Sequence, residues 1–293
     1  MTLQSWHSQL ISLPQSPVDY HIAWTDHPGQ QTPVLWLHGF SGSGKLGWKM
    51  LELLDYRPLM TIDLPGHGRS RIKDLKTDFG FSRWSRHLLA ILDKLQIQTL
   101  HLAGYSMGAR LALAFALRYP QRVCSLVLES VNPGLTSHSL RLQRRTIETR
   151  WARDLVENPI KFWRQWQTQP LFAQLSRRNP LGGTALQATR SHQDVKQLVR
   201  SMQWLGTGHQ PGFASFLDRL TMPVLLLTGD EDQKYRDIAG RMLPGLPQGY
   251  WINIRETGHA VYLEQPIVLA KAIKSHLQSN KMTSTQRLNR RQC

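Results

Sequence analysis

The fold is decided by the stretch GYSMGARLALAFALRYP at residues 104–120, in which Ser106 lies between two closely spaced glycines. The apolar run that leads into the serine predicts a buried strand, and the apolar segment after it, stopped by Pro120, predicts a short buried helix. The turn between them is so tight that side chains at the glycine positions would clash with the strand and the helix. This pattern predicts a reactive serine exposed at the end of a sheet, with an ordinary strand-to-helix turn as the alternative.

Short runs rich in aliphatic and β-branched residues predict buried parallel strands at 33–39, 59–66, 99–106, 123–130 and 223–230. Helical patterns separate these runs. From Phe81 to Leu95 the apolar residues recur every three or four positions, which predicts an amphipathic helix. The alternation of strand and helix predicts an α/β fold, with a mostly parallel central sheet and helices on both faces.

The alternation stops between residues 132 and 215, where helical stretches rich in Arg, Gln and Trp replace the strands. We therefore expect a helical cap at 132–215, inserted between two parts of one core at 1–131 and 216–278, and a basic, disordered tail at 279–293. The cap segment holds twelve Arg and Lys against four Asp and Glu. About half of the net charge of +16 therefore falls in the cap.

The composition is that of a globular protein, with 41% hydrophobic and 19% charged residues. The strong positive charge raises nucleic acid or an anionic membrane as partners. No nucleic-acid-binding motif accompanies the charge, no secretory signal opens the chain, and the apolar runs are too short to span a bilayer. Cys124 and Cys293 make no disulfide framework, and the histidine spacing predicts no metal site. We expect a cytoplasmic protein that binds neither nucleic acid nor membrane.

Two segments after the cap supply partners for Ser106. LTGDEDQKY places Asp232 in the loop after a predicted strand, and RETGHAVYLEQP places His259 after the next one, 27 residues further on. In this order His259 would exchange the serine proton and Asp232 would hold the imidazole tautomer. Asp230 competes for the acid role. Asp232 is preferred because it is the third residue after Gly229, the position at which this kind of fold presents its acid.

Such a serine also needs donors for a developing oxyanion. The expected pair is the backbone N–H of Met107, directly after the serine, and the backbone N–H of Phe40 in the segment LHGF. His38 and Gly39 would shape the turn that carries Phe40. His67 in DLPGHGRS is interpreted as a loop residue.

These residues resemble the α/β-hydrolase superfamily and, more narrowly, the 2-succinyl-6-hydroxy-2,4-cyclohexadiene-1-carboxylate synthases of menaquinone and phylloquinone biosynthesis. The resemblance runs from about residue 18 to 278. It is carried by LHGFSGSG (37–44), IDLPGHGRS (62–70), GYSMGARLALAFALRYP (104–120), LVLESVNPGL (126–135), GTGHQP (206–211), LLLTGDEDQKY (225–235) and TGHAVYLEQP (257–266). The most discriminating of these are ESVNPGL, GTG-x-QP, D-x-K-Y and Arg110, the arginine directly after the tight serine turn at 104–108 (the elbow).

The resemblance implies a lyase that needs no cofactor and no metal. A proton is removed next to a carbonyl of 2-succinyl-5-enolpyruvyl-6-hydroxy-3-cyclohexene-1-carboxylate, and pyruvate is eliminated. Ser106, the serine of the Ser106-His259-Asp232 triad, acts as the base. The substrate carries several carboxylates, and arginine pairs with carboxylates through two parallel hydrogen bonds. A basic cap therefore suits a small polycarboxylate.

The resemblance also implies which arginines bind the substrate: Arg110, Arg144 and Arg190. The match at Arg190 is weaker, because the segment around it differs in length from its counterpart, and Arg178 is the alternative. For each cap arginine the competing interpretation is a solvated helix face.

Tyr105 and Trp166 match aromatic pocket positions, although Trp166 could instead pack between cap helices. Ala109 departs from the family, which often has glycine there, and its methyl group would tighten the elbow. Two other functions remain open at this point: a serine hydrolase of an ester or carbon-carbon bond with Ser106 as nucleophile, and a basic protein that binds without catalysis. The sequence does not fix the oligomeric state.

Overall fold

The computed structural model describes residues 5–26, 31–169, 175 and 179–289. Within them, nine strands form one sheet in the order β1-β2-β4-β3-β6-β7-β8-β9, with β5 paired to β2. β1 and β2 run antiparallel to their neighbours, and β3, β4, β6, β7, β8 and β9 run parallel. The strands are β1 His7–Ser12, β2 Val18–Trp24, β3 Val34–Leu37, β4 Leu59–Ile62, β5 Arg71–Ile72, β6 Leu100–Tyr105, β7 Val123–Glu129, β8 Val224–Gly229 and β9 Gly249–Ile254.

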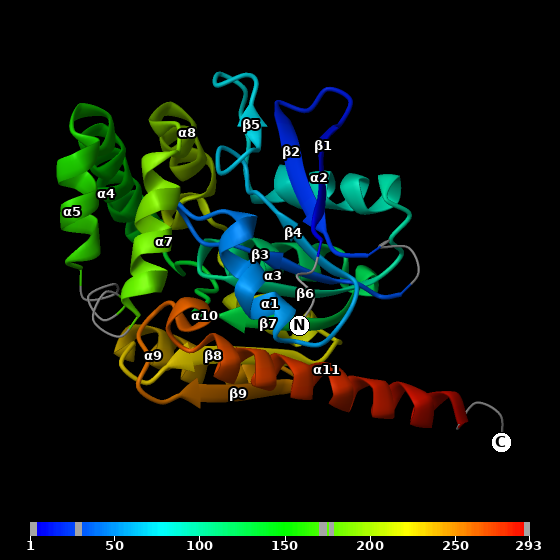
Figure 1. The fold of residues 1–293 in the computed structure, drawn as a ribbon. Coiled ribbons are helices and arrows are strands. Elements are labelled where there is room, and N and C mark those ends of the chain that lie inside the picture. The colour runs from blue at the N-terminus through cyan, green and yellow to red at the C-terminus, as the bar shows by residue number, and fades with distance from the viewer. Residues whose placement is uncertain (1–4, 27–30, 170–174, 176–178, 290–293) are drawn as a thin grey trace.

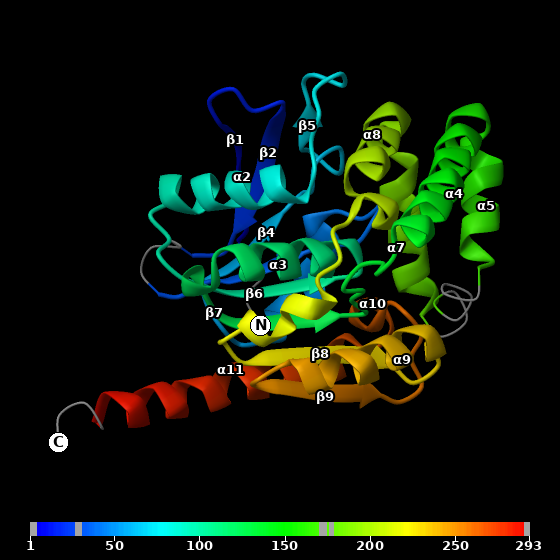
Figure 2. The same ribbon diagram turned by 180° about the vertical axis from the view of Figure 1, so that it is seen from behind.

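Helices cover both faces of this sheet, as the sequence predicts. α1 and α11 lie on one face (Figure 1), and α2, α3 and α9 lie on the other (Figure 2). Successive residues of β3 divide between the layers: Leu35 and Leu37 pack on the α2 and α3 side, whereas Val34 and Trp36 pack on the α1 and α11 side. These helices are α1 Trp48–Glu52, α2 Phe81–Lys94, α3 Met107–Arg118, α9 Gln233–Met242, α10 Val261–Glu264 and α11 Pro266–Asn289.

Between β7 and β8 the described residues contain no strand, and they form the helices α4 His138–Glu157, α5 Pro159–Gln167, α7 Pro180–Ser191 and α8 Val195–Leu205. They stand together at the end of the sheet to which the arrowheads of β7, β8 and β9 point (Figure 1). Several of their apolar side chains form a cluster of their own around Leu155, Phe162, Trp166 and Leu198. Because loops at the carboxyl ends of parallel strands carry the functional residues of such folds, these helices lie over the expected site.

The predicted α/β architecture is confirmed, and the structure adds elements that the sequence analysis did not include. β1 and β2 form an antiparallel pair before the first predicted strand. α11 continues to Asn289, so helix extends into the segment 279–293, for which the sequence predicts a disordered tail; residues 290–293 lie outside the described part. No helix in the described part of the chain combines the length and apolar composition needed to cross a membrane.

Candidate active site

Ser106 lies at the turn between β6 and α3 in a strained backbone conformation. Its φ is 51° and its ψ is −106°, a region that non-glycine residues rarely adopt. The two flanking glycines allow the turn. A Cβ atom on Gly104 would lie 2.6 Å from the carbonyl carbon of Gly108, and one on Gly108 would lie 2.2 Å from the carbonyl oxygen of Leu37. The turn therefore presents the Ser106 side chain above the end of β6.

His259 and Asp232 lie beside this serine in a hydrogen-bonded row. The His259 Nδ1 atom is 2.6 Å from Asp232 Oδ2, and its Nε2 atom is 3.1 Å from Ser106 Oγ. Both partners are buried, His259 to 1% exposure and Asp232 to 5%. A carboxylate only accepts, so Nδ1 carries the proton and Nε2 is left to accept from the serine hydroxyl.

Asp230 has a different task in the same loop. Its Oδ1 atom accepts the backbone N–H of Thr257 at 3.2 Å, which ties the loop after β8 to the loop that carries His259. Asp232, in contrast, caps α9 by accepting the N–H of Tyr235 at 3.3 Å while it holds His259. Asp230 therefore links the two loops, and Asp232 is the acid that contacts the imidazole.

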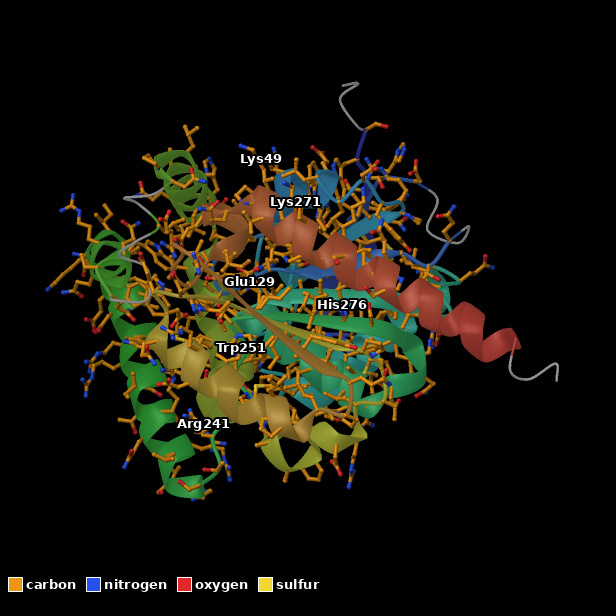
Figure 3. All side chains as sticks on the ribbon, turned by 90° about the horizontal axis from the view of Figure 1, so that it is seen from below. Lys49, Glu129, Arg241, Trp251, Lys271 and His276 are labelled. Atoms are coloured by element: carbon orange, nitrogen blue, oxygen red, sulfur yellow. The ribbon has the colours of Figure 1, made fainter. Side chains whose placement is uncertain are left out.

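A second set of contacts holds the His259 loop from below. Ser130 Oγ donates to the carbonyl of His259 at 2.9 Å, and Glu129 Oε1 accepts the N–H of Tyr262 at 3.0 Å. Glu129 lies toward the middle of the molecule in the view from below (Figure 3) and is 2% exposed. Burial raises its pKa to about 8, and the charge of Glu264 adds to the effect.

Phe40 and Met107, the two expected oxyanion donors, line the same space as Ser106. Met107 opens α3, and Phe40 follows Gly39 at the end of β3; neither N–H donates to another group within the described residues. His38 fixes the turn before Phe40, because its Nε2 accepts the N–H of Leu64 at 2.9 Å and its Nδ1 donates to the Gly39 carbonyl at 2.7 Å. Burial lowers the pKa of His38, which keeps the ring neutral for these two bonds.

A pocket opens above Ser106 between the core and the cap helices. It holds about 970 Å³ of space between its walls, part of it open to solvent. The predicted residues that line it are Phe40, Tyr105, Ser106, Met107, Arg110, Arg144, Trp166 and Arg190.

Arg110 reaches the pocket from the first turn of α3. It is 8% exposed, and its Nη1 atom donates to the Leu205 carbonyl at 2.9 Å and to Gln210 Oε1 at 3.2 Å. Burial lowers its pKa to about 10, so the side chain stays positively charged at neutral pH. A core helix thus supplies a cation that the end of the cap holds in place.

Arg144 reaches the pocket from α4. Its Nε atom donates to Glu148 Oε1 at 2.8 Å, and its guanidinium carbon lies 4.6 Å from the centre of the Trp151 ring. The side chain is 29% exposed, so it faces the opening while the carboxylate beneath it is buried.

Arg190 lies in the wall formed by α7. It is 5% exposed, its Nε atom donates to Ser41 Oγ at 2.9 Å, and its guanidinium carbon lies 4.9 Å from the Trp163 ring centre. Burial lowers its pKa to about 10. Arg178, the alternative, lies outside the described residues.

The aromatic residues also line the pocket. The Tyr105 ring centre is 5.3 Å from that of His259. Trp166 is 9% exposed and packs against Phe40 at 5.8 Å and Trp151 at 5.0 Å. Trp166 therefore belongs both to the packing between cap helices and to the pocket wall, so the two interpretations of this residue are compatible.

Among the lining residues to which the sequence analysis gave no role are Lys234, Tyr235 and Glu148. Lys234 and Tyr235 form the end of the D-x-K-Y motif, which was noted without a role and could have indicated them. Lys234 is exposed, and desolvation together with the charge of Arg144 lowers its pKa. Tyr235 packs on His259 with ring centres 4.5 Å apart. Within the part of the chain that the structure describes, no group of His, Cys, Asp and Glu side chains is arranged to hold a metal ion.

Comparisons with known proteins show the family of this chain and several of its relatives. The family model described as alpha/beta hydrolase fold matches residues 32–266. A protein of Bacillus subtilis (strain 168) is 33% identical over 264 residues, covering 89% of this chain and 96% of that relative. The 2-succinyl-6-hydroxy-2,4-cyclohexadiene-1-carboxylate synthase of Salmonella newport (strain SL254) is 33% identical over 242 residues, covering 82% of this chain and 92% of the relative. Among solved structures, MenH from S. aureus is similar with a TM-score of 0.80 and 28% identity, covering 85% of this chain and 94% of that chain.

Proposed function

This chain belongs to the alpha/beta hydrolase fold family and, within it, to the 2-succinyl-6-hydroxy-2,4-cyclohexadiene-1-carboxylate synthases, and we propose that it carries out their reaction in menaquinone or phylloquinone biosynthesis. It eliminates pyruvate from 2-succinyl-5-enolpyruvyl-6-hydroxy-3-cyclohexene-1-carboxylate. The observation that carries the proposal is the meeting of a serine-histidine-aspartate row with three arginines in one pocket.

The three arginines give a physical reason for a polycarboxylate substrate. Arg110, Arg144 and Arg190 come from α3, α4 and α7, and all three line the pocket beside Ser106. A guanidinium fork binds a carboxylate through charge-assisted hydrogen bonds, which are shorter and stronger than neutral ones. Cations from three different elements would orient a substrate with several carboxylates and would give an apolar ester little to bind.

The chemistry follows from the hydrogen-bonded row. Ser106 gives its hydroxyl proton to His259 Nε2 and takes the proton from the ring carbon that carries the succinyl group, while Asp232 stabilises the imidazolium. The charge that develops on the succinyl carbonyl oxygen is held by the N–H groups of Phe40 and Met107. The electron pair then shifts through the ring double bond, the carbon-oxygen bond breaks, and enolpyruvate leaves. The proton held by the His259 imidazolium balances the one that enolpyruvate takes up to become pyruvate, so the row returns to its starting state. No acyl-enzyme forms in this reaction.

A serine hydrolase would need the same triad and the same oxyanion donors, so the reaction must be tested directly. The test supplies the enolpyruvyl cyclohexene precursor and follows pyruvate and the conjugated diene, with a p-nitrophenyl ester assayed in parallel. We expect rapid release of pyruvate and negligible cleavage of the ester. Cleavage of the ester without release of pyruvate would assign the triad to hydrolysis instead.

The charge gives the remaining alternative, a basic protein that binds nucleic acid. Binding of random-sequence DNA that weakens steeply with added salt would favour that alternative. Absence of binding at low salt would exclude it, and two of the cap cations, Arg144 and Arg190, are held in the pocket wall by Glu148 and Ser41. We place the enzyme in the cytoplasm, where its precursor would be a soluble metabolite.

A further inference from the structure

The pocket contains an acid where a polycarboxylate is expected to bind. Glu148 lines the pocket, is 4% exposed, and belongs to the middle of α4. A negative charge in such a place repels the substrate by simple Coulomb interaction. Its presence among arginines therefore needs a reason that outweighs the repulsion.

The contacts of Glu148 supply one. Its Oε1 atom accepts Arg144 Nε at 2.8 Å and the backbone N–H of Thr207 at 2.8 Å, and its Oε2 atom accepts the N–H of Gly208 at 3.1 Å. Two of these three donors are backbone groups of a short turn after α8, so they fix the carboxylate in space. The carboxylate in turn fixes the Arg144 side chain, which stacks on Trp151 on the same helix.

The glycines of the turn are shaped to this carboxylate. A Cβ atom on Gly206 would lie 2.4 Å from Glu148 Oε2, and one on Gly208 would lie 3.0 Å from the same atom. A larger residue would also meet the Met202 carbonyl at position 206 and Arg145 at position 208, so this turn, packed on the carboxylate, has no room for a side chain. The pattern GTG at 206–208 thus has a physical explanation as the seat of Glu148.

The same turn also holds the second arginine. Arg110, from the core helix α3, donates to the Leu205 carbonyl and to Gln210 Oε1 on either side of the GTG pattern. Gln210 is fixed by its own bond to the Asn132 carbonyl at 2.8 Å. Residues 205–210 therefore hold one arginine of the core directly and one arginine of the cap through Glu148.

We propose that Glu148 is a positioning residue: its carboxylate, seated on the 206–208 turn, holds Arg144 in the orientation that binds a substrate carboxylate. The inference rests on the proposed function only for the identity of that carboxylate. With Nε engaged by Glu148, the two terminal nitrogens of Arg144 are directed toward the incoming anion. The orientation gained outweighs the repulsion from the acid.

The first variant removes the charge and keeps the size. In Glu148→Gln an NH2 group replaces one oxygen and faces a backbone donor, so the side chain cannot satisfy all three partners. We expect KM to rise about ten-fold with kcat within about two-fold of the unmodified value, as for loss of a binding interaction that does not act in the chemical step. Glu157→Gln, which removes an exposed charge from the same helix, is the control and should leave both constants unchanged.

A second variant separates position from charge. Glu148→Asp keeps the negative charge but is one methylene shorter, so it cannot reach Arg144 and the 206–208 turn together. We expect KM to rise in this variant also. A KM that stays native in Glu148→Asp and falls in Glu148→Gln would mean that the acid acts only by repulsion, and would overturn the proposal. The Asp variant carries the test even if the Gln variant does not fold.

Coupling between the two residues gives a readout that does not need turnover. Tricarballylate, a flexible tricarboxylate, serves as the probe, and its affinity is measured by calorimetry for Arg144→Ala, Glu148→Gln and the double variant. The double variant should bind it no more weakly than Arg144→Ala alone, because Glu148 acts through Arg144. Losses that multiply in the double variant would refute the positioning role. If the unmodified chain binds tricarballylate but releases no pyruvate, the proposed function fails and this inference is still tested.

Discussion

Replacing Glu129 by Gln should change how the stability of the protein depends on pH. Glu129 is the last residue of β7, is 2% exposed, and its carboxyl group accepts the N–H of Tyr262 in α10, which follows the loop that carries His259. Burial raises its pKa from the ordinary 4.5 to about 8. The group is therefore protonated in the folded protein at neutral pH, and Gln is a close replacement for this neutral form.

The sign of the effect follows from the two states. Below pH 4.5 the Glu129 carboxyl is protonated in both the folded and the unfolded chain. Between 4.5 and about 8 only the folded chain keeps the proton, so unfolding releases it and the free energy of unfolding falls as the pH rises. Above about 8 both states are ionised and the loss is complete. At about 1.36 kcal/mol per pKa unit, the free energy of unfolding falls by roughly 5 kcal/mol over the whole interval.

The assay is urea unfolding of the native chain and of Glu129→Gln at intervals from pH 5 to pH 9. Taking the difference between the two proteins cancels the contribution of every other titrating group. The stability of the variant relative to the native chain should grow by about 1.4 kcal/mol per pH unit up to about pH 8 and then level off. Glu157→Gln, at an exposed position, should show no such trend. A difference that is constant across the range would refute the reasoning.

The remaining predictions concern the pocket and the elbow. Ser106→Ala should lower the rate of pyruvate release by about 10³-fold or more, and near-native turnover would exclude its role as base. Arg110→Ala and Arg144→Ala should each weaken substrate binding by about 1.5 to 3 kcal/mol, or roughly ten- to hundred-fold in KM, and an unchanged KM in both would exclude the carboxylate pocket. Arg110→Ala should also lower the free energy of unfolding, by about 1 to 3 kcal/mol, because it leaves two acceptors without a donor, and urea unfolding measures this. Gly108→Ala should destabilise the protein, since its Cβ would meet backbone atoms, whereas the same change at Gly240, where the Cβ meets only a ring atom at 3.9 Å, should stabilise it by about 0.4 to 1 kcal/mol in the same assay.

The central sheet could be predicted because its strands are buried on both faces. The four residues Val34 to Leu37 are all buried, and such a strand is a continuous apolar run that is visible in the sequence. β1 lacks this signal, since most of its residues are exposed. β2 carries a weaker one, the alternation of Val18, Tyr20, Ile22 and Trp24, and a search for period two would have found it.

The candidate site divides in the same way. The positions of Ser106, Asp232 and His259 could be predicted because each follows a strand, and the ends of parallel strands meet at one edge. The arginines of the cap could be named only through the resemblance, since an arginine on a helix has the same local pattern whether it faces solvent or a pocket. Lys234 belongs to the D-x-K-Y motif, but its role could be inferred only from its position in the lining of the pocket.

Glu148 shows where local reasoning ends. An acid four residues after Arg144 on a helix is what an ordinary exposed ion pair looks like, and such a pair contributes only about 0.2 to 0.5 kcal/mol. Glu148 differs from such an exposed pair because a turn some sixty residues later donates two backbone N–H groups to its carboxylate. No periodicity or spacing within α4 reports that contact. The glycines at 206 and 208 are the only trace of it in the sequence, and they become informative once the carboxylate that they accommodate is known.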